Sequence, residues 1–217
     1  MKWPTIVIDD FLDDPDEIVK IANSFTYQKG PDGKWPGERS LFQADTQLDS
    51  FLLSRILKAV YPNTDNKEET LKYKAQAYFQ KITQKEEGWI HSDEPFEFTA
   101  ILYLTKNKKG GTSLYKPKSF RCSQKHSQYK FQYYQTGIKP EGYEKALREN
   151  NNQFEETMYF ESIYNRLIVF DSYQIHGVKE YNTSSNEPRL TYVGFFEEVI
   201  GLNLKTGVLE SKRKQCL

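Results

Sequence analysis

The spacing of apolar residues changes near residue 71, and this change limits the possible folds more than any other feature of the sequence. Before it, a segment that starts at Asp14-Pro15 and the segment Leu48–Val60 show the spacing of amphipathic helices. After it, residues 73–80 alternate in the manner of a strand with one buried face. Further strand-like segments are Phe98–Leu104, Thr112–Tyr115, Arg166–Phe170 and Arg189–Phe196. Helices followed by many short strands predict an α+β protein, mainly β, with a sandwich or small-barrel core.

Length and composition fit a single domain. The chain has 217 residues, enough for one core, and its aromatic content of 15% favours β-structure. We expect an N-terminal strand and supporting helices in residues 1–70, the β core in residues 71–197 and a C-terminal tail in residues 198–217. Within the first part, the glycines and prolines of residues 28–46 predict a loop.

Several observations bear on location. No apolar run approaches the roughly 20 residues of a membrane span. Asp9 and Asp10 interrupt the start of the chain, so we expect no signal peptide. The two cysteines, Cys122 and Cys216, cannot form a disulfide framework. We therefore expect a cytoplasmic protein with no membrane association.

Three polar residues form a candidate metal site. His91 and Asp93 are two residues apart, so on an extended chain their side chains point to the same side. His176 follows the apolar strand that ends near Phe170. Two imidazoles and one carboxylate make the facial triad that suits non-haem Fe(II) and leaves positions for a chelating cosubstrate and O₂.

A second pair lies thirteen residues beyond His176, where Arg189 and Thr191 share one strand face. A guanidinium beside a hydroxyl can clamp a carboxylate with two parallel hydrogen bonds. If this strand lies beside the one that carries His176, a short dicarboxylate can chelate the metal with one end and reach Arg189 with the other.

At these residues the chain resembles the Fe(II)/2-oxoglutarate-dependent dioxygenases, whose pattern is His-x-Asp, a distant His and then Arg-x-Ser/Thr. The strand Phe98–Thr105, followed by Gly110-Gly111, resembles the prolyl-hydroxylase-like branch of that superfamily. Residues 7–12 and 36–40 also resemble small, uncharacterised bacterial and phage members. The resemblance covers most of residues 5–197.

The resemblance implies a double-stranded β-helix, or jelly-roll, with flanking N-terminal helices. It implies Fe(II) held by His91, Asp93 and His176, with 2-oxoglutarate as cosubstrate and O₂ as oxidant. The far carboxylate of 2-oxoglutarate is then held by Arg189, with Tyr103 in the role of the family's matching tyrosine. The implied reaction couples 2-oxoglutarate decarboxylation to hydroxylation of a substrate C–H bond.

The chain departs from the simplest family pattern by an insert at about residues 116–160, which is a lid, a substrate platform or an interface. The formal net charge is zero, but residues 98–140 contain no Asp or Glu. The lysines and tyrosines of the insert either form a stacking surface for nucleic acid or a solvated face over ordinary packing, and the second is more common. We expect the insert to cover the barrel mouth near His91 and to favour an anionic substrate or partner.

Some residues allow two interpretations. Asp171 follows a strand and fits a turn better than a metal ligand, and His126 fits the surface. Trp89 packs in the core or lines the substrate pocket. Gln76, Tyr78 and Gln80 share one strand face that points either into the barrel or to water.

Two other classes of function compete with the oxygenase. One is a non-enzymatic jelly-roll binding module, and the other is a nucleic-acid oxidative demethylase, supported only by the basic insert. The sequence leaves the prime substrate open, whether small molecule or macromolecule, and also the oligomeric state.

Overall fold

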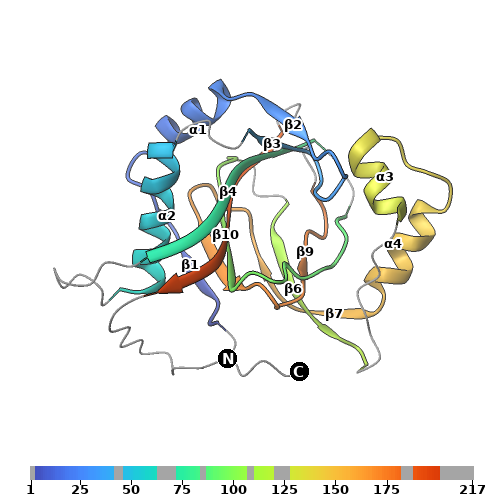
Figure 1. Cartoon of the computed structure of the whole chain (residues 1–217). Coiled ribbons are helices and arrows are strands. Elements are labelled where there is room, and N and C mark those ends of the chain that lie inside the picture. The colour runs from blue at the N-terminus through green and yellow to red at the C-terminus, as the bar shows by residue number, and fades with distance from the viewer. Residues whose placement is uncertain are drawn as a thin grey trace.

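Two antiparallel sheets enclose the interior of the protein, and helices cover the outside of the larger one (Figure 1). The computed structural model describes residues 3–41, 46–62, 72–83, 87–106, 110–119, 128–181 and 188–200. The expected positions of His126, Cys122 and Cys216 lie outside these ranges, as does the tail beyond Ile200.

The larger sheet has seven strands in the order β1-β8-β5-β10-β4-β3-β2. Their bounds are β1 Ile6–Ile8, β2 Tyr27–Lys29, β3 Glu38–Ser40, β4 Lys72–Ile82, β5 Phe98–Tyr103, β8 Leu167–Asp171 and β10 Arg189–Ile200. The smaller sheet has the order β7-β6-β9, with β6 Thr112–Pro117, β7 Phe154–Phe160 and β9 His176–Gly177. Two facing antiparallel sheets joined by such crossovers form the double-stranded β-helix that the sequence predicts.

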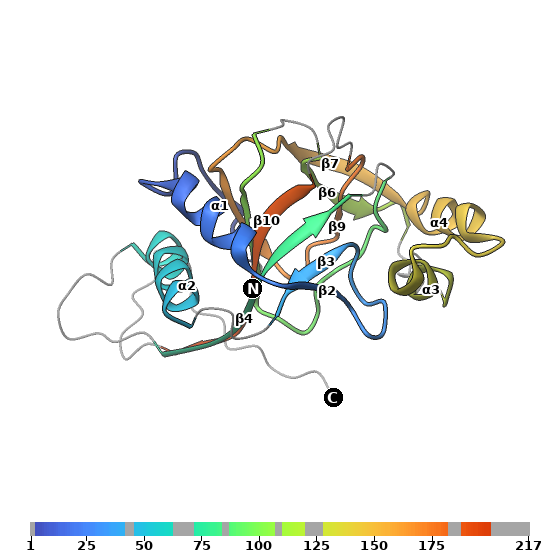
Figure 2. The same cartoon turned by 90° about the horizontal axis from the view of Figure 1, so that it is seen from above.

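Helices α1 (Pro15–Ser24) and α2 (Thr46–Val60) pack on the outer face of the larger sheet (Figures 1 and 2). The first begins as expected, because the Asp14 carboxylate accepts a hydrogen bond from the backbone N–H of Glu17 at 3.1 Å. The apolar faces of both helices join one core cluster with the outward side chains of β4, β5 and β10. This cluster holds the larger sheet in place behind the pocket.

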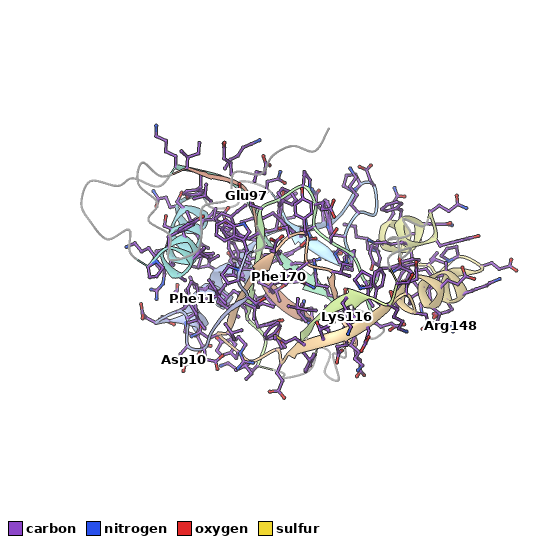
Figure 3. The ribbon with its side chains drawn as sticks, turned by 90° about the horizontal axis from the view of Figure 1, so that it is seen from below. Asp10, Phe11, Glu97, Lys116, Arg148 and Phe170 are labelled. Carbon is purple, nitrogen blue, oxygen red and sulfur yellow. The ribbon has the colours of Figure 1, made fainter. Side chains whose placement is uncertain are left out.

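The two faces of the larger sheet differ in polarity. On β10, Leu190, Tyr192 and Phe196 belong to the helix-covered core, whereas Arg189 and Thr191 line the pocket between the sheets. On β4, Gln76 and Gln80 line the same pocket, so the inward interpretation of that face is correct. Phe170 lies in the middle of the molecule, between the sheets (Figure 3).

The expected loop and the expected insert both need correction. Within residues 28–46, the structure forms β3 and the end of β2, which are too short to give a periodic signal. Residues Phe154–Phe160, assigned to the insert, form β7 and pair with β6. Only the two ends of β7 are buried, so its sequence lacks the alternation of a half-buried strand.

Between β6 and β7, the described residues of the insert form two helices, α3 (Gln128–Thr136) and α4 (Tyr143–Asn151). Both lie at the end of the molecule away from α1 and α2 (Figure 2). Among the described residues, no helix is long and apolar enough to cross a membrane.

Candidate metal centre and pocket

Backbone pairing brings the two histidines together. The N–H of His91 donates to the carbonyl of His176 at 2.9 Å, and the N–H of His176 donates to the carbonyl of His91 at 2.8 Å. Residues directly opposite in an antiparallel pair point to the same face, and here the ring centroids lie 4.6 Å apart. The bridge therefore adds the His91 segment to the smaller sheet beside β9.

Asp93 completes the group from two residues further on. Its backbone N–H donates to the carbonyl of Ser172 at 2.8 Å, which fixes the chain beside the end of β8. Its carboxylate lies 3.2 Å from Nε2 of His176 and 3.5 Å from Nε2 of His91. Oδ2 also accepts a hydrogen bond from the hydroxyl of Thr99 on β5, at 2.8 Å.

Hydrogen bonds at the other ring nitrogens orient both imidazoles. Nδ1 of His91 lies 2.7 Å from the carbonyl of Trp89, and Nδ1 of His176 lies 2.9 Å from the carbonyl of Gln174. A carbonyl only accepts, so each Nδ1 carries a proton, and each Nε2 points toward Asp93 as the atom that a metal ion can bind. This is the arrangement by which proteins orient histidine ligands for a metal.

The donor set fits a divalent metal ion. One ligand atom from each of His91, Asp93 and His176 lies within 4.8 Å of the other two. Burial by itself would raise the pKa of Asp93, but the neighbouring His176 and His91 hold it well below its usual value, so the carboxylate is ionised. Two imidazoles and one carboxylate on one side of a cavity leave the other side open for further ligands.

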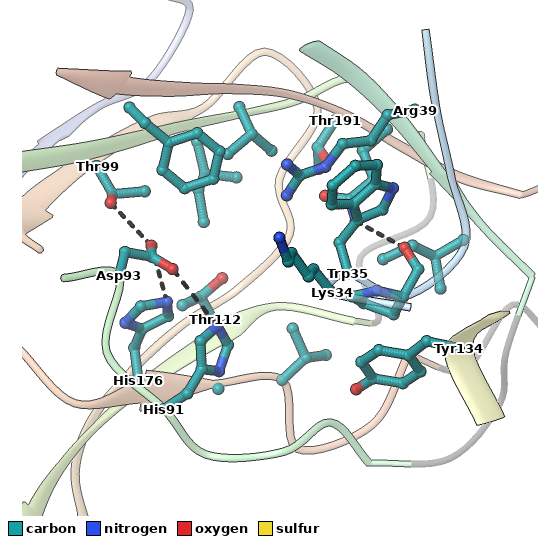
Figure 4. Close-up of a pocket in the computed structure, with 18 of the residues that line it drawn as sticks. Lys34, Trp35, Arg39, His91, Asp93, Thr99, Thr112, Tyr134, His176 and Thr191 are labelled. Carbon is teal, nitrogen blue, oxygen red and sulfur yellow. Dashed lines mark hydrogen bonds and ion pairs between the residues drawn. The ribbon is translucent and has the colours of Figure 1, made fainter. Parts of the chain in front are cut away.

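The three residues border a pocket of about 490 Å³ between the sheets (Figure 4). Figure 4 shows His91, Asp93 and His176 on one side and Arg39, Trp35 and Thr191 on the other. Val193 and Phe195 continue the inward row of β10 along the pocket.

Arg189 and Thr191 lie in the pocket as the sequence pattern requires. The guanidinium of Arg189 is buried, donates through Nε to the carbonyl of Gly110 at 2.6 Å, and lies 5.3 Å from the ring of Tyr103. The hydroxyl of Thr191 is buried and has no hydrogen-bond partner in the described part of the chain. A buried hydroxyl without a partner is costly, so this atom is suited to bind a ligand.

Tyr103 lies one strand over from Thr191, because the two residues are paired across β5 and β10. Its side chain is buried, and its hydroxyl donates to Oγ1 of Thr112 at 2.7 Å. Tyr103 therefore packs beside Arg189 and forms a hydrogen bond with Thr112, which lines the pocket.

Two cations of the pocket were not singled out in the sequence. Arg39 lies on β3, with its guanidinium 4.5 Å from the ring of Trp35. Lys130 lies on α3 and is only 7% exposed. Arg39 falls in residues 36–40, which resemble family members, but that resemblance gave it no role, and no motif marks Lys130.

Asp171 and Trp89 both have structural roles. Asp171 is a turn residue, since its carboxylate accepts from the N–H groups of Trp3 and Tyr173 at 2.8 and 2.9 Å. Trp89 packs in the core of the insert, where Nε1 donates to the hydroxyl of Tyr143 at 3.2 Å.

The α4 residue Asn151 accepts from the N–H of Ile90 at 3.0 Å, so the insert helices lie beside the segment that carries His91.

The family model described as "Family of unknown function (DUF6445)" matches residues 1–196. The chain belongs to this family. The DUF6445 match includes strands of both sheets and all the pocket residues described above, from Trp35 to Phe195. A search of the curated proteins found no match.

Solved structures show the same fold. HygX from Streptomyces hygroscopicus, with nickel and 2-oxoglutarate bound, matches with a TM-score of 0.51 and 12% identity, over 88% of this chain and 82% of that chain. A 2OG-Fe(II) oxygenase family oxidoreductase from Burkholderia pseudomallei matches with a TM-score of 0.50 and 12% identity, over 89% of this chain and 84% of that chain. This member of DUF6445 therefore has the fold of the 2OG-Fe(II) oxygenases, and the jelly-roll prediction is confirmed.

Proposed function

We propose that the protein is a non-haem Fe(II)- and 2-oxoglutarate-dependent oxygenase, and that it hydroxylates a C–H bond. One observation carries the proposal. One ligand atom from each of two imidazoles and one carboxylate lies within 4.8 Å of the others, at a pocket that also contains a buried arginine and a hydroxyl with no partner among the described residues. A metal triad and a carboxylate clamp in one pocket match both ends of 2-oxoglutarate.

In this proposal His91, Asp93 and His176 hold the iron, and Arg189 and Thr191 hold the far carboxylate of 2-oxoglutarate. The resemblance implies that Tyr103 also binds this carboxylate, but its hydroxyl donates to Thr112 and its ring packs beside Arg189. We therefore propose that Tyr103 positions the Arg189 guanidinium. With 2-oxoglutarate and O₂, bound iron supplies the oxidising chemistry. The protein residues orient the cosubstrate, and the aromatic and aliphatic lining of the pocket limits the access of water.

A non-enzymatic jelly-roll is the weaker alternative, because a binding module has no use for a carboxylate clamp beside its metal. A nucleic-acid demethylase gains no support from three described lysines of the basic segment. Lys106 pairs with Asp16 at 3.1 Å and Lys116 with Glu155 at 3.3 Å, while Lys130 is buried. Lysines in these settings do not form the open basic face that nucleic acid requires.

The test is the binding of Mn(II) and 2-oxoglutarate by calorimetry, followed by iron-dependent formation of succinate. We expect one metal per chain, 2-oxoglutarate binding that depends on the metal, and slow succinate formation without prime substrate. His176→Ala should abolish all three, while His126→Ala, with a histidine assigned to the surface, should change none. Full retention of metal by His176→Ala would refute the triad, and turnover without metal would refute the reaction class.

A further inference from the structure

The strongest unexplained feature of the pocket is a pair of cations, Arg39 and Lys130, that face the metal ligands from a separate wall. Arg39 is paired with Gln80 across β3 and β4, and Gln80 is paired with Thr191 across β4 and β10. These three residues therefore form one inward row across the sheet. Lys130 reaches the same pocket from α3.

A specific contact joins the two segments that carry these cations. Gly33, in the loop between β2 and β3, has a φ of +61°, and a Cβ at this position would lie 1.9 Å from the backbone oxygen of Phe131 on α3. The side chain of Gln135 donates to the carbonyl of Pro31 at 2.7 Å. The loop and α3 thus form one continuous wall of the pocket. Lys130 is adjacent in sequence to Phe131, the α3 residue that Gly33 approaches.

Neither cation has an acidic partner in the part of the chain that the structure describes. Among the described residues, no carboxylate lies within ion-pair distance of Arg39 or Lys130, and Nε of Arg39 has no hydrogen-bond partner. The guanidinium of Arg39 lies among three aromatic rings, of which those of Tyr78 and Phe195 are 5.1 and 5.2 Å away. The other lysine of the insert that packs on tyrosines, Lys139, has Glu144 at 2.6 Å.

Burial has a measurable cost for both groups. It lowers the pKa of Lys130 to about 8 and the pKa of Arg39 to about 10, although attraction to Asp93 opposes the shift in each case. A desolvated cation without a partner destabilises the free protein, and a bound anion removes that cost. A role in binding an anion explains why these two cations lie in a pocket and not in the core.

Arg39 is placed to bind something other than 2-oxoglutarate. Arg189 lies at the start of β10 against Tyr103, whereas Arg39 lies against Phe195, which is about 20 Å further along that strand. Phe195 pairs with Thr99, the residue that holds the Asp93 carboxylate. The Arg39 guanidinium therefore lies further along β10 than Arg189, and Figure 4 shows it across the pocket from the metal ligands.

A charge count points the same way. The formal charges of Fe(II), Asp93, 2-oxoglutarate and Arg189 sum to zero, so Arg39 and Lys130 would remain uncompensated in that complex. Glu94 also lines the pocket, but its side chain is exposed and accepts from the hydroxyl of Ser92 at 2.9 Å. The complete complex would still attract an anion at the wall formed by the loop and α3.

We propose that Arg39 and Lys130 form a second anion site, which holds a carboxylate or phosphate group of the substrate opposite the metal. This rests on the proposed oxygenase function. The planar fork of Arg39 suits two oxygens of one oxyanion, and Lys130 adds a point charge from the other side. Trp35 and Phe195 beside Arg39 suit an apolar or aromatic body attached to that anion.

The test uses protein loaded with Mn(II) and saturating 2-oxoglutarate, titrated in a calorimeter with benzoate and with phenyl phosphate. We expect at least one of the two probes to bind saturably, and the preferred probe tells carboxylate from phosphate. Arg39→Met and Lys130→Met should each weaken it at least about tenfold, and Arg39→Lys by less, because the charge remains without the fork. The control is Lys145→Met, which removes an exposed lysine of α4 and should have no effect.

The 2-oxoglutarate affinity of each variant separates the two proposals. It should stay within about twofold of the parent in Arg39→Met and Lys130→Met, which also shows that these variants are folded. If 2-oxoglutarate binds but neither probe saturates, or the probes bind Arg39→Met as tightly as the parent, only the second anion site is refuted. If Arg39→Met loses 2-oxoglutarate instead, Arg39 belongs to the cosubstrate clamp. If the parent binds no 2-oxoglutarate, the oxygenase proposal itself fails.

Discussion

The two cationic regions of the pocket are held in different ways. Arg189 lies on β10, which pairs with a long strand on each side, and it donates to the carbonyl of Gly110 while packing on Tyr103. Arg39 and Lys130 lie on a three-residue strand and an insert helix, and neither has an acidic partner among the described residues. The first region is fixed by the central sheet whether or not a ligand is bound. The second depends on one loop–helix contact and is incomplete without an anion.

The sharpest test of this contrast is Arg189→Met, for which we expect the largest effect. It should weaken 2-oxoglutarate binding about 100-fold or more, close to 3 kcal/mol, because one carboxylate of the ligand is left buried without its charged partner. Arg189→Lys should cost roughly 1–3 kcal/mol, since an ammonium cannot copy the guanidinium fork. Calorimetry on Mn(II)-loaded protein measures both. An unchanged affinity in Arg189→Met would place the clamp elsewhere.

In the second region, we expect that removal of a cation stabilises the free protein. Lys130→Met should raise the free energy of unfolding of the metal-free protein by on the order of 1–3 kcal/mol near neutral pH, because a buried unpaired ammonium is replaced by an apolar side chain. Denaturant unfolding measures the difference. Lys145→Met is the control, because its lysine is exposed and should contribute little.

The difference in unfolding free energy between Lys130→Met and the parent should depend on pH. Burial lowers the pKa of Lys130 to about 8, so between that value and the ordinary lysine pKa the unfolded chain binds more protons than the folded one. The stability of the parent therefore gains from Lys130 as the pH rises through this range. The advantage of Lys130→Met should be largest below pH 8 and should shrink above it. The charged or titratable groups around Lys130 are Asp93, His91, His176 and Tyr134, with Arg39 in the same pocket, and all five are unchanged in the variant. A constant advantage across the range would show that Lys130 is not desolvated.

The same contrast explains what the sequence could predict. His91 and His176 also meet through tertiary pairing, but the order and spacing of His91, Asp93, His176, Arg189 and Thr191 match a family pattern. That resemblance made these residues predictable. Arg39 and Lys130 are 91 residues apart in the chain, and they line one pocket where the loop that contains Gly33 packs against α3. A contact of this kind depends on tertiary packing, and no period or spacing records it. The strand β7 escaped prediction for the same reason, since its pairing with β6 and not its own pattern makes it a strand.

Gly33→Ala should break the second region and leave the first intact. The new Cβ would overlap the backbone oxygen of Phe131, and alanine is also strained at a φ of +61°, so we expect a loss of about 1–2 kcal/mol in unfolding free energy. Binding of benzoate or phenyl phosphate should weaken, while metal and 2-oxoglutarate binding persist. The matched control is Gly142→Ala, with a φ of +85° but no atom closer than 3.7 Å to its Cβ. Equal effects of the two variants would mean that the contact with Phe131 contributes nothing beyond backbone strain.

The smallest expected effect concerns the one polar atom of the first region that has no partner. The Thr191 hydroxyl is buried next to the clamp, and no described group accepts from it or donates to it. If its partner is the 2-oxoglutarate carboxylate, the hydroxyl is costly in the free protein and useful in the complex. Thr191→Val should then shift two measurements in opposite directions. Unfolding free energy should rise by about 1 kcal/mol, and 2-oxoglutarate affinity should fall by about fivefold, also close to 1 kcal/mol.

Thr112→Val separates this effect from a general preference for valine in a strand. The Thr112 hydroxyl accepts from Tyr103 at 2.7 Å, so its removal leaves a buried tyrosine hydroxyl unpaired and should lower the unfolding free energy. The same chemical change is thus expected to stabilise the protein at one position and destabilise it at the other. If Thr191→Val is more stable yet binds 2-oxoglutarate as tightly as the parent, the hydroxyl is not part of the clamp. Arg189 would then hold the far carboxylate without the Thr191 hydroxyl. The stability of the first region would come from the central sheet and not from the bound ligand.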